Sequence, residues 1–232
     1  MLNVNNLKFC YPSNFTLDVN CSLPQGARVA VIGPSGSGKS TFFALLSGFL
    51  KANSGELYFH EKNITHTEPG QRPISYIFQE HNLFEHLTIQ QNVGLGLHTK
   101  FKFSQKEKDK IFEALTKFNI ELYQNEYPTR LSGGQRQRVA LARCALENKP
   151  ILLLDEAIQS VGPEQRKSIM SHIISMQQSY PKTLLFITHH KDVMSYLATH
   201  ILFLDQGRIS FFGTLENFFL AKNLEKFSDY IT

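Results

Sequence analysis

A glycine-rich segment that follows a short apolar run constrains this chain more than any other feature. It reads Gly33-Pro34-Ser35-Gly36-Ser37-Gly38-Lys39-Ser40, which is the phosphate-loop spacing G-x-x-x-x-G-K-[ST]. Glycines let the backbone curl and approach an anion without a Cβ in the way. The N–H groups of such a loop and the positive end of the helix that follows converge on phosphate. The segment therefore predicts a strand, loop and helix that bind a nucleotide.

The side chains of this loop predict how the nucleotide and its metal ion are held. We expect Lys39 to neutralise the β- and γ-phosphates and the Ser40 hydroxyl to ligate Mg²⁺. The predicted nucleotide-binding residues of this region are Gly33, Pro34, Ser35, Gly36, Ser37, Gly38, Lys39, Ser40 and Thr41. The loop alone does not distinguish a kinase from a GTPase, a helicase or a transporter subunit.

Two adjacent carboxylates, Asp155 and Glu156, end an apolar run that begins at Ile151. A continuous apolar run is typical of a buried parallel strand, and functional groups gather at the carboxyl ends of such strands. Together with the phosphate loop, this placement indicates that Asp155 holds Mg²⁺ and that Glu156 is the general base for the attacking water. The alternative is an ordinary surface Asp-Glu pair.

A second anion-binding helix start is predicted about a hundred residues after the first, at Leu131-Ser132-Gly133-Gly134-Gln135. Ser132 is a suitable helix N-cap. The two glycines that follow it leave the backbone N–H groups open to an anion. The chain thus has two helix starts that suit phosphate.

The order of apolar runs along the chain predicts an α/β fold with a helical insertion. Strands are expected at 2–9, 15–23, 27–32, 57–60, 74–78, 151–154, 183–188 and 201–204, with helices at 164–178 and 191–198. The alternation after Pro150 favours a mostly parallel sheet, and the first strands favour an antiparallel part. The segment from about 88 to 147 reads as helical, and in 104–118 the apolar residues Ile111, Phe112, Leu115 and Phe118 recur at helical spacing.

Composition narrows the class of partner. Of 232 residues, 42% are hydrophobic, which is enough for a sizeable core, and the net charge of +4 is too small to require nucleic acid. The longest apolar stretch, Phe42–Leu50, falls far short of the roughly 20 residues that a spanning helix needs. We therefore expect a protein that is soluble or docks on a membrane-spanning partner.

The motifs together resemble the ABC ATPase family, whose signature is LSGGQ. They occur in the family's order over nearly the whole chain: Tyr11, residues 33–40, Gln79, residues 131–135, residues 151–156 and His189. The resemblance implies a P-loop NTPase core at about 1–87 and 148–232, and a helical subdomain at about 88–147. It also implies that the whole chain is one ABC ATPase domain.

The resemblance assigns roles that the residues alone do not. Tyr11 would stack on adenine; Gln79 would sense the nucleotide, contact Mg²⁺ and link to the helical subdomain; His189 would contact the γ-phosphate and the attacking water. Two copies would pair head to tail around two ATP molecules. Ser132, Gly133, Gly134 and Gln135 would then contact the nucleotide held by the other copy. The implied catalytic residues are Lys39, Gln79, Glu156 and His189.

Within the family, the segment from Phe78 to Leu97 is similar to importers, and most similar to the ATPases of thiamine and thiamine pyrophosphate importers. This implies two membrane-spanning permease subunits, a periplasmic solute-binding protein, and a peripheral position on the cytoplasmic face of the bacterial inner membrane. In that family this region faces the permease, and exposed apolar side chains among Leu83, Phe84, Leu87 and Leu95 would form the docking surface. The alternative is that they pack in the core of the helical subdomain, and we expect most of the four to be core and one or two to be exposed. Importers of ferric iron, polyamines or sulfate, a non-transport ABC ATPase and an exporter remain the alternatives.

Two positions depart from the family pattern. Ala157 stands where a proline usually follows the acidic pair, and Gly162 stands where the next loop usually has an aspartate. That loop, aligned at 159–162, crosses the dimer interface in the family, so its missing carboxylate predicts slower or less tightly coupled hydrolysis. The alternative, that the loop tolerates the substitution, is equally compatible with the sequence.

Overall fold

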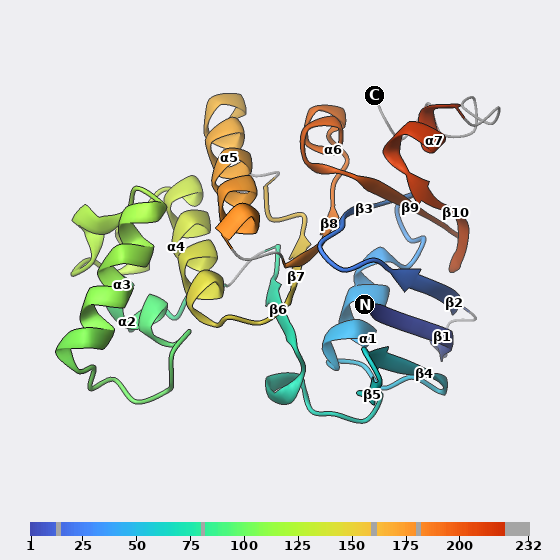
Figure 1. Cartoon of the computed structure of the whole chain (residues 1–232), viewed down its shortest axis with the longest axis horizontal. Helices are drawn as coiled ribbons and strands as arrows, with labels where there is room; N and C mark the ends of the chain where they lie inside the picture. Colours follow the sequence, from blue (N-terminus) through green and yellow to red (C-terminus); the bar gives the residue numbers. More distant parts are fainter. Residues whose placement is uncertain (13–14, 80–81, 159–161, 180–181, 221–232) are drawn as a thin grey trace. The chain divides into compact units, whose positions relative to one another are not determined.

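The computed structural model describes residues 1–12, 15–79, 82–158, 162–179 and 182–220, which divide into two compact units (Figure 1). The first unit contains the described residues of 1–74, 150–155 and 182–220, and the second contains those of 75–149 and 156–179. The expected interfacial loop at 159–161 lies outside the described residues, and Gly162 is exposed.

The first unit is built on a mixed sheet whose strands follow the order β5-β4-β1-β2-β10-β9-β3-β8-β7. Their bounds are β1 Leu2–Cys10, β2 Thr16–Leu23, β3 Arg28–Ile32, β4 Ser54–Phe59, β5 Lys62–Asn63, β7 Ile151–Asp155, β8 Thr183–Ile187, β9 His200–Asp205 and β10 Arg208–Thr214. β6, Ile74–Ile77, begins at the last residue of this unit's first segment. The predicted strands are all present, whereas β10 and the short β5 were not predicted.

The sheet has a parallel part and an antiparallel part, as the sequence predicts. β3 pairs in parallel with β8 and β9, and β7 pairs in parallel with β8. β1 pairs antiparallel with β2 and β4. All five residues of β7 and of β8 are buried, which explains their continuous apolar sequence, since a parallel strand is covered on both faces.

Three helices belong to the first unit: α1 Lys39–Ser47, α6 Lys191–Leu197 and α7 Leu215–Leu220. α1 starts directly after the phosphate loop and ends at Gly48, whose φ of 87° is the left-handed conformation that glycine favours at a helix end. The aromatic side chains of Phe42 and Phe43 are fully buried. α1 is therefore anchored by its own core face, which fixes the loop at its start.

The second unit is helical, with α2 Ile89–Gly94, α3 Gln105–Lys117, α4 Gly133–Leu146 and α5 Pro163–Ser179. Helix α4 contacts the other three (Figure 1). Thr88, Ser104 and Ser132 cap the first three helices with reciprocal capping boxes, so polar residues in the sequence set where these helices begin. Among the described helices, none is long and apolar enough to cross a bilayer.

The four apolar residues that recur at helical spacing near α3 do not all face the core. Ile111, Leu115 and Phe118 are buried, but Phe112 is 48% exposed. The three buried residues follow the i, i+4, i+7 spacing of one helix face, whereas Phe112 is displaced from that face by one residue, about 100° around the helix. Apolar character alone therefore does not place Phe112 in the core.

Candidate functional site

The phosphate loop joins the buried end of β3 to α1 and is open along its middle. Gly38 has a φ of 101° and occupies the N-cap of α1, and Gly36 has a φ of 77°. A Cβ on Gly33 would lie 1.9 Å from the Leu204 carbonyl oxygen, whereas a Cβ on Gly36 would have no described atom within 4 Å. Gly33 is therefore required by close backbone packing, and Gly36 by its φ alone.

Lys39 lies under this loop. Its Nζ donates hydrogen bonds of 2.8 Å to the carbonyl oxygens of Gly33 and Pro34, and the residue is only 7% exposed. The ammonium group is thus held at the loop by carbonyl oxygens at its first two residues. This places the positive charge where phosphate oxygens would meet the loop N–H groups.

Ser40 and Asp155 approach each other from α1 and the end of β7. The Ser40 hydroxyl donates to Asp155 Oδ1 at 3.4 Å, and Asp155 is 8% exposed. A hydroxyl and a carboxylate are the oxygen ligands that Mg²⁺ prefers, and Mg²⁺ commonly takes one or two protein ligands with the rest from phosphates and water. This pair therefore fits the ion that the sequence predicts.

Tyr11 lies just after β1, in the same unit as the phosphate loop. Its ring is 38% exposed and meets Phe9 edge-on, with centroids 4.8 Å apart and planes at 85°. Phe15, for which the sequence predicts a strand position and no role at the site, lies 6.3 Å from Tyr11 between ring centroids, and its ring atom Cζ is 2.8 Å from where a Cβ on Gly38 would be. Phe15 thus borders the start of α1, and Gly38 leaves room for its ring there.

Two further predicted catalytic residues follow buried strands. Glu156 comes directly after β7 with a φ of 51°, a left-handed conformation that is uncommon for a residue with a side chain. Such conformations persist where the surrounding structure imposes them, and they are frequent in active sites. His189 lies two residues after β8 and is exposed. Glu156 belongs to the second unit and His189 to the first.

The signature segment forms the start of α4 in the second unit. The Ser132 hydroxyl accepts the Gln135 N–H at 3.3 Å, and the Gln135 side-chain oxygen accepts the Ser132 N–H at 2.8 Å. A Cβ on Gly133 would meet no described atom within 4 Å, so the helix start is open to an approaching group. Gln79, which follows β6 in this unit, is exposed.

Comparison with known proteins finds relatives that all belong to one family, the ABC transporter ATP-binding proteins. The ABC transporter family model matches residues 16–159. The thiamine import ATP-binding protein ThiQ of Photobacterium profundum is 40% identical over 221 residues, covering 92% of each chain. ThiQ of Aliivibrio fischeri is 36% identical over 232 residues, covering 100% of this chain and 98% of the relative.

The solved structures that superpose on this chain are also ATP-binding cassettes. A nucleotide-free ATP-binding cassette from an ABC transporter superposes with a TM-score of 0.87 at 25% identity, covering 98% of both chains. The dimeric post-hydrolysis state of the cassette MJ0796 bound to ADP and Pi superposes with a TM-score of 0.81 at 27% identity, covering 93% of this chain and 99% of that one. The predicted fold class is confirmed.

Proposed function

Because this chain belongs to the ABC transporter family, we propose that it is the ATP-hydrolysing subunit of an importer of thiamine or thiamine pyrophosphate. The family resemblance drawn from the motifs is confirmed, and ATP hydrolysis coupled to transport is the activity of this family. The proposed substrate rests on the curated relatives named for thiamine import. The observation that carries the proposed activity is the joint placement of Lys39, Ser40 and Asp155 at one phosphate loop.

The loop residues 33–41 bind the phosphates of ATP in this proposal. Lys39 exchanges its hydrogen bonds with Gly33 O and Pro34 O for phosphate oxygens, and Tyr11 stacks on adenine. Ser40 and Asp155 would hold Mg²⁺, with Gln79 as the further predicted ligand, and the ion would neutralise charge that develops on the phosphate oxygens. The loop N–H groups need little rearrangement to receive the anion, because the backbone is already curled.

The predicted residues outside the phosphate loop would catalyse hydrolysis and contact the nucleotide of a second copy. Glu156 accepts the proton of the attacking water, and His189 holds the water against the γ-phosphate. A second copy of the chain supplies Ser132, Gly133, Gly134 and Gln135 to each nucleotide, where the helix start of α4 stabilises negative charge. The MJ0796 cassette, which is dimeric when bound to ADP and Pi, supports the association of two copies.

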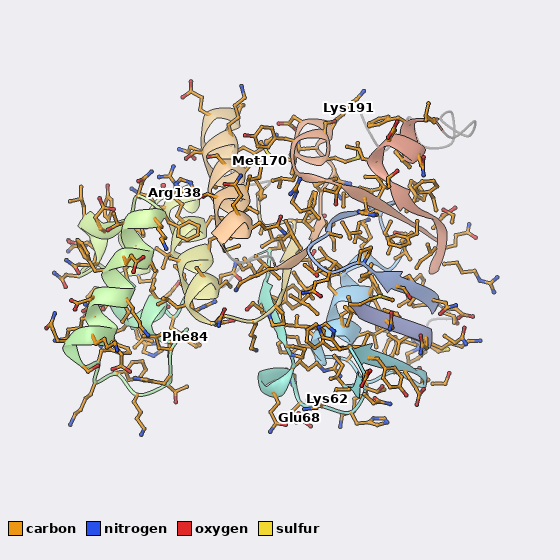
Figure 2. All side chains as sticks on the ribbon, in the orientation of Figure 1. Lys62, Glu68, Phe84, Arg138, Met170 and Lys191 are labelled. Atoms are coloured by element: carbon orange, nitrogen blue, oxygen red, sulfur yellow. The ribbon has the colours of Figure 1, made fainter. Side chains whose placement is uncertain are left out.

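The proposed transporter contains two permease subunits and a periplasmic solute-binding protein, with this subunit at the cytoplasmic face of the inner membrane. Of these four apolar residues, Leu87 is buried, Leu83 and Leu95 are half-buried, and Phe84, which is labelled in Figure 2, is 51% exposed, in line with the expectation that most are core. Phe84 is therefore the candidate anchor, since aromatic side chains dominate interface energies.

Asn92 on α2 holds the backbone around this anchor. It is fully buried; its Oδ1 accepts the Phe84 N–H at 2.8 Å, and its Nδ2 donates to the carbonyl oxygens of Phe84, Leu87 and Thr88 at 3.0 to 3.1 Å. One amide side chain thus closes the loop from Phe84 to Thr88. Phe84 is presented on an ordered loop, which lowers the entropy cost of docking.

We expect Phe84→Asp to reduce transport in cells by about tenfold and to leave the ATPase rate of the isolated subunit within about twofold. The control is Tyr196→Asp on α6, where the ring has nearly the same exposure, 53%. Uptake of radiolabelled substrate and hydrolysis by purified protein are compared for both variants. Equal uptake by the two variants would exclude Phe84 from the permease contact.

The proposed substrate is tested by uptake of radiolabelled thiamine in cells that lack this gene. The wild-type gene is expected to restore uptake, and Lys39→Ala is expected not to, because its ammonium group is the charge that the phosphates require. Normal thiamine uptake in the deletion strain would reject the proposal, and uptake of ferric iron, spermidine and sulfate would then separate the alternative importers.

A further inference from the structure

The turn between β9 and β10 contacts the phosphate loop at both of its ends. At the first end, the Leu204 carbonyl oxygen lies 1.9 Å from where a Cβ on Gly33 would be. At the other end, the Gly207 N–H donates to the Ser37 carbonyl oxygen at 3.0 Å. Residues 204–208, here called the backing turn, therefore contact the loop at two residues, Gly33 and Ser37.

The backing turn is itself fixed by β2. Its Gly207 carbonyl accepts the Asp18 N–H at 2.8 Å, and Arg208 pairs in parallel with Asp18. A Cβ on Gly207 would lie 2.0 Å from the Thr16 carbonyl oxygen, and the φ of Gly207 is 76°. Only glycine fits this position, because any side chain would push the turn away from β2.

Between these two contacts the loop is held by its own residues, because Pro34 O accepts hydrogen bonds from Lys39 Nζ at 2.8 Å and from the Ser37 N–H at 3.1 Å. A Cβ on Gly36 would meet no described atom within 4 Å, and a cavity of about 390 Å³ adjoins this residue. The cavity is lined by Phe15, Thr16, Asp18, Gly36, Gln206 and Arg208. The ends of the loop are thus held by backbone contacts while its middle remains accessible.

We propose that the backing turn holds the phosphate loop in its anion-binding conformation before the nucleotide arrives, with Gly207 as a positioning residue. This rests on the proposed function, in which residues 33–41 bind the phosphates of ATP. A loop whose backbone is already held in place loses less conformational entropy when ATP binds, so the turn raises affinity without touching the ligand. A shift of the turn displaces the Ser37 carbonyl, and with it the N–H groups on either side.

Gly207→Ala and Gly55→Ala form a matched pair that tests this role. Gly55, on β4, also has a left-handed φ of 87°, and its Cβ would lie 2.2 Å from the Asn6 carbonyl oxygen. Both substitutions strain the backbone of the same unit in the same way, but of these two glycines it is Gly207 whose N–H donates a hydrogen bond to the phosphate loop. Loss of thermal stability is expected in both, so stability alone does not separate them.

The readout is the dissociation constant of ATP, measured with the purified chain, alongside kcat at saturating ATP. We expect Gly207→Ala to weaken ATP binding by about tenfold or more relative to Gly55→Ala, with kcat at saturating ATP within about twofold. Equal ATP affinity in the two variants would overturn the inference. Lys39→Ala tests the premise separately, because unchanged affinity in that variant would reject the phosphate loop as the ATP site.

Hydrogen exchange of the wild-type chain gives a second measurement that needs no variant to fold. If the backing turn and the phosphate loop open together, ATP should slow exchange of the loop amides and also of the Gly207 amide, which donates to Ser37 O. Slowing at the loop with no change at Gly207 would contradict the proposal.

Discussion

Replacing Glu156 with glutamine is expected to slow ATP hydrolysis by ~10²–10⁴-fold while ATP remains bound. The amide keeps the size and backbone of the carboxylate but cannot accept a proton from water. Glu156 occupies a left-handed backbone conformation directly after the buried strand β7, so its side chain starts from a fixed position. Because the phosphate loop and Ser40 are untouched, the affinity for ATP should remain.

Glu164→Gln provides the control for this prediction. Glu164 is exposed in the first turn of α5, and its substitution makes the same chemical change eight positions further along the chain. Steady-state hydrolysis and ATP binding are measured for both variants, and Glu164→Gln should retain a rate within about twofold of wild type, as surface substitutions usually do. A Glu156→Gln enzyme that hydrolyses ATP normally would remove this residue from the role of base.

The parts of the site that the sequence predicts are those that depend on local backbone chemistry. The phosphate loop and the start of α4 each combine glycines with a helix start, so the place where each helix begins is encoded within a few neighbouring residues. The meeting of Ser40 with Asp155 follows from the rule that functional groups collect at the carboxyl ends of parallel strands. Pattern and spacing suffice in these cases.

Features that depend on contacts distant in sequence were not predictable in the same way. β10 has no clean alternation of buried and exposed residues, so its sequence does not stand out from a loop. The role of Gly207 depends on the positions of Thr16 and Ser37, far away in the chain. Asn92 and Arg72 are polar residues in a sequence where polar residues usually face water, yet both are buried. Their hydrogen-bond partners, and not their neighbours in sequence, explain why.

Arg72 is the buried charge on which we expect stability to depend most. Its guanidinium donates to the carbonyl oxygens of Leu45 and Leu46 at the end of α1, at 2.7 and 2.6 Å, and to those of Thr65 and Thr67 at 2.8 Å each. The residue is 4% exposed, and burial lowers its pKa, an effect that nearby Glu68 (labelled in Figure 2) opposes. One side chain thus donates hydrogen bonds to the carbonyl oxygens at the end of α1 and ties this helix to the segment before β6.

Arg72→Met is therefore expected to lower the free energy of unfolding by about 3–5 kcal/mol, because it removes the four hydrogen bonds of the guanidinium, and of their acceptors Leu45 O keeps the Gly48 N–H as a donor. The same change at Arg130, whose side chain is 73% exposed and pairs with Glu126 at 3.2 Å, should cost less than about 0.5 kcal/mol. Urea unfolding of both nucleotide-free variants measures the difference.

The guanidinium stabilises the fold through carbonyl oxygens on two separate segments, so Arg72→Lys should recover only part of the loss. An ammonium group lacks the planar fork of arginine and cannot reach all four acceptors. Equal unfolding midpoints for Arg72→Met and Arg130→Met would show that water replaces the guanidinium at little cost.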